Sequence, residues 1–105
     1  MTFDKIEALK NKIIEAEHPD KIILFGSHAA GTATEESDVD LLVISGSSLS
    51  RPDRETSLTR KLFGSGVPFD LLFLTPAEVE ERIRKNGPFI REILSRGKVL
   101  YERAA

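Results

Sequence analysis

The sequence predicts an α/β (α+β) fold with a small mixed β-sheet flanked by helices. Three short apolar runs, rich in Ile, Leu, Val and Phe, are typical of strands buried on both faces. Segments with helical periodicity lie before, between and after these runs, which is the element order of α/β architecture. The 105 residues, of which 40% are hydrophobic, fit one domain, residues 1–105, with one modest core.

Residues 3–25 begin the chain with a predicted helix and strand. Apolar side chains recur at steps of three and four residues in the first segment: Phe3, Ile6, Leu9, Ile13 and Ile14. This spacing places them on one face of a helix, which we expect to cover the sheet. The run KIILF, residues 21–25, follows Pro19 and predicts the first strand, ended by Gly26.

Two further strands are predicted within residues 37–45 and 68–75, and each carries acidic residues only near its beginning. Periodicity leaves open whether these two strands pair in parallel or antiparallel. Between them, Ser50 is a candidate N-cap of a helix in which Leu58 and Leu62 are four residues apart. We expect its basic side chains to be solvated, and contact with the triphosphate or with an acidic partner is the alternative: Arg51, Arg54, Arg60 and Lys61.

The C-terminal third predicts two helices and a final strand. Thr75 is a candidate N-cap, followed by Pro76 at the first helical position and by Glu78 in the place that completes a capping box. This helix ends at an Asn-Gly turn, and a last helix extends from Pro88 to a stop at Gly97. The segment KVLYE is then a candidate edge strand.

Composition excludes several kinds of protein. The sequence has no cysteine, which excludes disulfides, thiolate zinc sites and cysteine nucleophiles, and we expect a cytoplasmic location. The net charge of −2 gives no sign of a broad basic surface, so we expect no duplex nucleic acid as partner. No apolar run approaches the length that crosses a bilayer, so no membrane association is expected.

Acidic side chains at two strand starts predict a metal site. Asp38 and Asp40 are two residues apart, so on a strand they point to the same face. Two carboxylates that close repel each other unless a cation neutralises them, which favours a hard divalent metal such as Mg²⁺. Asp70 begins the third strand in the same relative position, and neighbouring strands would bring all three acids together.

The stretch GSHAAG follows the first strand, in a segment that is either a short loop or a short helix. Its glycines favour a short loop and turn that faces phosphate. Gly26 permits close approach of a ligand to the backbone, the Ser27 hydroxyl can donate a hydrogen bond, and Gly31 allows a second bend. A metal site beside a phosphate-binding turn indicates phosphoryl or nucleotidyl transfer.

Gly26-Ser27, ten intervening residues and then Asp38-Val39-Asp40, with Asp70 on the next strand, form a specific combined motif. The motif resembles the minimal nucleotidyltransferase (MNT) domain of the DNA polymerase β superfamily, in particular MntA-like antitoxins of HEPN/MNT toxin–antitoxin pairs. The resemblance extends from about Lys21 to Leu74 at the level of motifs, and the flanking helices are also typical.

The resemblance implies a polymerase-β-like nucleotidyltransferase fold and a role for each motif residue. It implies that Gly26 and Ser27 bind the nucleoside triphosphate, and that Asp38, Asp40 and Asp70 bind Mg²⁺, with two ions expected. Asp70 is also the implied base toward the acceptor hydroxyl. The implied reaction is AMPylation: transfer of AMP from ATP to a hydroxyl, expected to belong to a tyrosine, of a HEPN-type toxin.

Two alternatives remain open at this stage. Many relatives have arginines in the Gly-Ser loop, where this chain has His28 and Ala30. A non-catalytic antitoxin that neutralises its partner by occlusion is therefore one alternative. Nucleotidyl transfer to a small molecule such as an antibiotic is the other. The sequence leaves homo- and hetero-oligomers equally open.

Overall fold

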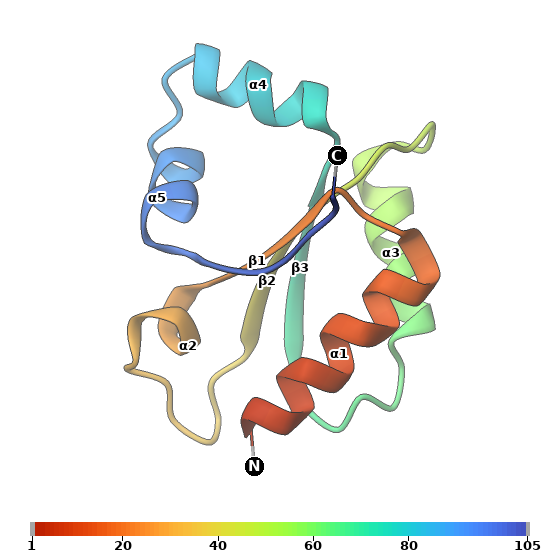
Figure 1. Cartoon of the computed structure of the whole chain (residues 1–105), viewed down its shortest axis with the longest axis vertical. Coiled ribbons are helices and arrows are strands. Elements are labelled where there is room, and N and C mark those ends of the chain that lie inside the picture. The colour runs from red at the N-terminus through yellow and green to blue at the C-terminus, as the bar shows by residue number, and fades with distance from the viewer. Residues whose placement is uncertain (1, 105) are drawn as a thin grey trace.

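A computed structural model describes residues 2–104 as a four-stranded sheet with five helices (Figure 1). The elements follow in the order α1 (Thr2–Glu17), β1 (Lys21–Phe25), α2 (Gly26–Ala30), β2 (Val39–Ile44), α3 (Arg51–Lys61), β3 (Phe69–Leu74), α4 (Pro76–Arg84), α5 (Pro88–Arg96) and β4 (Lys98–Glu102). The predicted α/β fold with a small mixed sheet flanked by helices is confirmed.

The strands lie side by side in the order β3-β2-β1-β4. β1 pairs antiparallel with both β2 and β4, whereas β2 and β3 are parallel. The direction that periodicity left open is thus parallel, and α3 supplies the crossover that a parallel pair requires. Parallel pairing places the first residues of β2 and β3 at the same end of the sheet. The candidate edge strand at residues 98–102 is confirmed as β4, beside β1.

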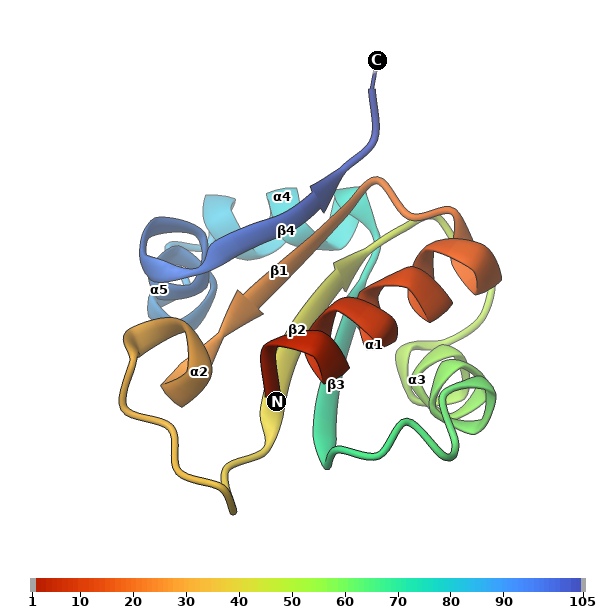
Figure 2. The same cartoon turned by 60° about the horizontal axis from the view of Figure 1, so that its bottom comes forward.

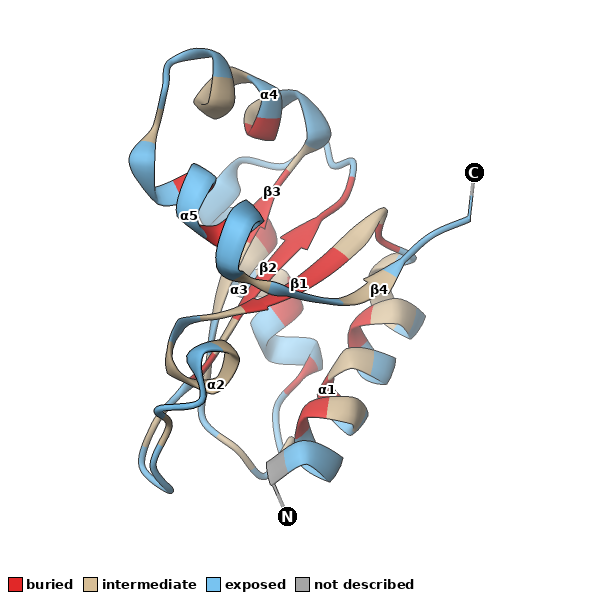
Figure 3. Cartoon of the chain, turned by 60° about the vertical axis from the view of Figure 1, so that its left-hand side comes forward, coloured by how far each residue is buried: buried red, intermediate tan, exposed pale blue. Residues whose placement is uncertain are grey.

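Helices cover both faces of the sheet (Figures 1 and 2). On one face, α1, α3 and the residue that follows α3 pack against alternate strand residues, among them Leu24, Val39, Leu41 and Phe73. The helical side chains buried there are Ile6, Leu9 and Ile13 of α1 and Leu58 of α3, and Leu62 follows α3. On the other face, α4 and α5 bury Val79, Ile90 and Ile93 against Ile23, Leu42, Ile44 and Leu74. The buried parts of β1 and β2 therefore lie between two layers of helices, as Figure 3 shows in red.

The predicted apolar face of the first helix is wrong at its first residue. Ile6, Leu9 and Ile13 are buried as expected, but the Phe3 side chain is 65% exposed. Phe3 lies in the first turn of α1 and takes no part in the cluster beneath the rest of the helix. Periodicity identifies the face of a helix but not where along its length the neighbouring layer ends.

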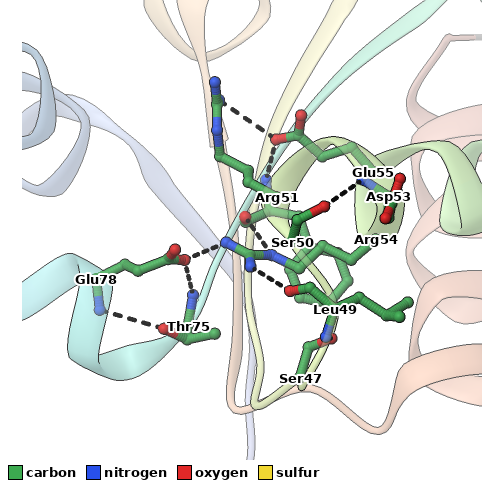
Figure 4. Close-up of polar contacts among 10 residues, drawn as sticks. Ser47, Leu49, Ser50, Arg51, Asp53, Arg54, Glu55, Thr75 and Glu78 are labelled. Carbon is green, nitrogen blue, oxygen red and sulfur yellow. Dashed lines mark hydrogen bonds and ion pairs between the residues drawn. The ribbon is translucent and has the colours of Figure 1, made fainter.

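Arg54 also differs from the sequence expectation, because this side chain is only 4% exposed instead of solvated. Its guanidinium donates to the carbonyl oxygens of Phe73 and Leu49 at 3.0 Å each and forms an ion pair with Glu78 (Figure 4). These contacts connect α3 to the end of β3 and to the start of α4. Burial of the charge is tolerated because its donors have partners.

The predicted helix starts are confirmed. The Ser50 hydroxyl accepts a hydrogen bond from the Asp53 N–H, and Thr75 and Glu78 form a complete capping box at the start of α4. Pro88 begins α5, which ends before Gly97. Within residues 2–104, no helix is both long enough and apolar enough to span a lipid bilayer.

Candidate nucleotidyl-transfer site

Two carboxylates lie next to each other where β2 and β3 begin. Asp40 and Asp70 are direct partners in the parallel register. Strand residues alternate between faces, and Leu42 and Leu74 belong to the cluster under α4 and α5, so both aspartates point to that face. The pairing thus places Asp70 beside Asp40, at the start of the second strand.

Asp38 lies just before β2 and is exposed, as is Asp70, whereas Asp40 is partly buried. Burial, and then the negative charges of Asp70 and Asp38, raise the pKa of the Asp40 carboxyl above its ordinary value of 3.8, while His28 acts in the opposite direction. The charges of Asp38 and Asp70 therefore act on Asp40, and a bound cation would stabilise the ionised form of the Asp40 carboxyl.

Gly26 touches the Asp40 carboxylate. Phe25, the last residue of β1, is the register partner of Asp40, so the next residue passes directly beside that side chain. A Cβ atom on Gly26 would lie 2.1 Å from Oδ2 of Asp40, and the backbone φ of +73° also favours glycine. Only glycine allows the backbone to pass this close to the carboxylate.

The segment after β1 is a short helix, α2, which is one of the two forms, loop or helix, that the sequence left open. It spans Gly26–Ala30 and is followed by Gly31 in the left-handed conformation, so the second bend is where it was expected. Nε2 of His28 lies 3.2 Å from the Ser37 carbonyl oxygen. This contact joins α2 to the segment just before Asp38, so the two parts of the sequence motif are in contact.

A pocket of about 640 Å³ lies between α2 and α5. Gly26 and Ser27 form part of its wall, and α5 contributes Phe89, Glu92, Ile93 and Arg96. The two helices are neighbours on the same side of the molecule in Figures 1 and 3. The residues predicted to bind a nucleotide thus face an open volume.

The carboxylates suit a hard cation in their chemistry. Their oxygens are the ligands that Mg²⁺ prefers. Burial, followed by the charges of Asp70 and Asp38, raises the pKa of Asp40, so a bound cation would favour its ionised form. In residues 2–104, however, no three His, Cys, Asp or Glu side chains are grouped closely enough to hold a metal ion. Asp38, Asp40 and Asp70 remain the predicted ligands, and binding requires their side chains to converge.

The contribution of α5 to this site was not predicted from the sequence. Phe89 and Arg96 lie far from the Gly-Ser and Asp-x-Asp motifs in sequence and belong to no recognisable motif of their own. The one available signal was indirect. The candidate edge strand that follows Gly97 had to pair with some strand, and pairing with β1 brings the end of α5 beside Gly26.

Substitution of Gly26 by alanine should displace the Asp40 carboxylate, because the new Cβ overlaps Oδ2. Gly31→Ala is the matched control, since its φ of +79° carries the same backbone penalty, about 1 kcal/mol, with no atom near the new Cβ. We expect the carboxyl carbon resonance of Asp40 to shift in Gly26→Ala alone, with a larger loss of unfolding free energy than in Gly31→Ala. Equal losses and an unmoved resonance would contradict the contact.

Replacement of Asp40 by asparagine should stabilise the metal-free fold at neutral pH. Because the pKa of Asp40 is raised on folding, its contribution to stability is fully present below pH 3.8 and is lost as pH rises through the folded-state pKa. The advantage of Asp40→Asn should therefore be negligible at low pH and should grow toward pH 7. Denaturant unfolding in chelator, with the exposed Glu36→Gln as control, measures it; an advantage that is independent of pH would refute the coupling.

Comparison with known proteins confirms the resemblance. Residues 7–105 match the family described as Polymerase beta, Nucleotidyltransferase. A chain of Methanocaldococcus jannaschii, provisionally named a protein adenylyltransferase, is 39% identical over 83 residues, which are 77% of this chain and 77% of that relative. A second chain of that organism with the same provisional name is 38% identical over 85 residues, 78% of this chain and 58% of that relative.

Solved structures show the same fold. A provisionally named nucleotidyltransferase from Sulfolobus solfataricus aligns with a TM-score of 0.65 at 18% identity, over 95% of this chain and 79% of that one. A toxin–antitoxin crystal structure with AMP-PNP aligns with a TM-score of 0.55 at 23% identity, over 98% of this chain and 75% of that one. The match over residues 7–105 shows that the chain belongs to the polymerase β nucleotidyltransferase family.

Proposed function

We propose that this chain is a Mg²⁺-dependent protein adenylyltransferase that transfers AMP from ATP to a tyrosine hydroxyl of a HEPN-type toxin and thereby acts as its antitoxin. The observation that carries the proposal is the in-register pair Asp40 and Asp70 beside Gly26. Family membership supports nucleotidyl transfer as the reaction. The names of the two archaeal relatives support a protein as acceptor.

Gly26 and Ser27 are the proposed triphosphate contacts. The absence of a side chain at Gly26 keeps the path between the α2–α5 pocket and the Asp40 carboxylate short. Ser27 offers a hydroxyl donor at the wall of the same pocket. A triphosphate in this position would have its reacting phosphorus near the carboxylates.

Asp38 and Asp40, with Asp70 as third ligand, are the residues that would hold Mg²⁺. When bound, the metal supplies the positive charge that offsets the triphosphate and the carboxylates and favours ionisation of the acceptor oxygen. Asp40 would be the central ligand, because its strand, β2, lies between β1 and β3.

Asp70 is the proposed base. It is exposed on β3, an edge strand, so an acceptor side chain from a partner can approach it from solvent. In the proposed step the tyrosine oxygen bonds to the α-phosphorus of ATP, the bond from that phosphorus to the bridging oxygen breaks, and pyrophosphate leaves. The phenolic proton passes to the Asp70 carboxylate.

A toxin as acceptor is supported by the toxin–antitoxin structure that shares this fold and contains AMP-PNP. Neutralisation by occlusion without transfer is the second candidate. It is favoured by the sequence between Lys21 and Arg51, which contains no Lys or Arg. The Gly-Ser segment therefore has no lysine or arginine of its own to bind phosphate. The two candidates differ in whether the carboxylates are needed for protection.

The direct test incubates the chain with α-labelled ATP, Mg²⁺ and a purified HEPN-type toxin as the candidate partner. We expect label on the toxin, its loss on replacement of the acceptor tyrosine by phenylalanine, and at least about a hundredfold slower transfer by Asp40→Asn because a metal ligand is removed. Asp53→Asn, an exposed acid in the first turn of α3, should transfer normally.

Protection of cells from the toxin separates the two candidates. An Asp38→Asn, Asp40→Asn double variant that still binds the toxin should fail to protect if transfer neutralises the toxin. Full protection by this variant would establish occlusion. Absence of label on the toxin with the unaltered chain would overturn the proposed enzyme activity.

A further inference from the structure

An arginine on α5 lies across the pocket from the Gly-Ser segment. Arg96, the last residue of α5, lines the same pocket as Gly26 and Ser27. The sheet register explains this position: Leu24 is paired with Lys98, and two residues beyond this pair the antiparallel segments reach Gly26 and Arg96. Residues far apart in the sequence thus meet at one end of β1.

The helix that carries Arg96, α5, is packed against β1 at both of its ends. At the C-terminal end of α5, a Cβ atom on Gly97 would lie 2.5 Å from Cγ2 of Ile23 and 3.0 Å from the Leu24 carbonyl oxygen, so the chain is closely packed there. At the N-terminal end, the Phe89 ring meets the Phe25 ring edge to face with centroids 5.8 Å apart. Arg96 therefore projects from a preorganised element.

The Gly-Ser side of the pocket offers little positive charge to a phosphate. No Lys or Arg lies between Lys21 and Arg51 in the sequence. The imidazole of His28, the one basic ring in that segment, already contacts the Ser37 carbonyl oxygen. The three aspartates are assigned to Mg²⁺, so a positively charged side chain for the phosphates has to come from another element of the chain.

Arg96 can be that cation. Across the described residues 2–104 its side chain makes no hydrogen bond and no ion pair, whereas Arg91 on the same helix donates to the Ile83 carbonyl oxygen. A guanidinium presents donors in a fork that matches two phosphate oxygens at once. Glu92 lies one turn earlier on the same wall, which places the phosphates toward the Arg96 end of the pocket.

We infer that Arg96 contacts the phosphate chain of the nucleotide and supplies the positive charge that the Gly-Ser segment lacks, so that α2 and α5 together form the triphosphate subsite. This inference rests on the proposed function, because it takes the ligand to be the ATP used for transfer. It assigns to α5 a substrate-binding role in addition to its packing on the sheet.

The test measures the affinity of the chain for AMP-PNP with Mg²⁺ by calorimetry, at several salt concentrations. Arg96→Ala should weaken binding roughly ten- to hundredfold, as expected for loss of a charge-assisted contact, and should flatten the dependence of affinity on salt. Arg96→Lys should recover part of the affinity and the salt dependence. Glu92→Gln should bind at least as tightly as the unaltered chain.

Lys98→Ala is the matched control. Lys98 is an exposed, positively charged residue two positions after Arg96, but its side chain does not line the pocket. The Lys98→Ala variant should bind AMP-PNP like the unaltered chain. Two results would overturn the inference but not the proposed function. The first is equal affinity of Arg96→Ala and the unaltered chain for AMP-PNP, and the second is a loss of affinity with unchanged salt dependence. Absence of AMP-PNP binding by the unaltered chain would overturn both.

Discussion

Parallel pairing of β2 with β3 puts two carboxylates side by side, and the arrangement of the site depends on that repulsive contact. Asp40 and Asp70 share one register position, and Asp38 adds a third negative charge just before β2. A folded chain retains such repulsion only if the rest of the structure enforces it. Here the enforcement comes from the apolar residues that follow each aspartate, because Leu41, Leu42, Leu71 and Leu72 fix the register through packing on both faces.

Two segments next to β1, the Gly26 end of the strand and the end of α5, complete the site beside the aspartates. Gly26 passes beside the Asp40 carboxylate at the end of β1, and α5 returns to the same strand through the close contact of Gly97. Contacts at the opposite end of β3, where Arg54 joins α3 to α4, are remote from the aspartates and serve to hold the layers together. The sheet thus has one end that is stabilised by polar contacts and one end at which like charges collect.

Local signals in the sequence identified most elements and the residues of the candidate site. Proline, glycine and capping residues defined the starts of α3, α4 and α5, and the apolar runs located β1, β2 and β3 to within a few residues. The parallel direction of β2 and β3, the exposure of Phe3 and the burial of Arg54 could not be predicted, because each depends on contacts between segments distant in sequence. The contribution of Arg96 to the pocket was missed for the same reason.

The central claim is that Asp38, Asp40 and Asp70 form a site for a divalent cation, and the titration of Asp40 tests it most directly. The measurement follows the Asp40 carboxyl carbon by NMR against pH, in chelator and in millimolar Mg²⁺. In chelator the pKa should lie above the ordinary value of 3.8, and Mg²⁺ should lower it because the cation favours the ionised form. A titration curve that Mg²⁺ leaves unchanged would contradict the metal site.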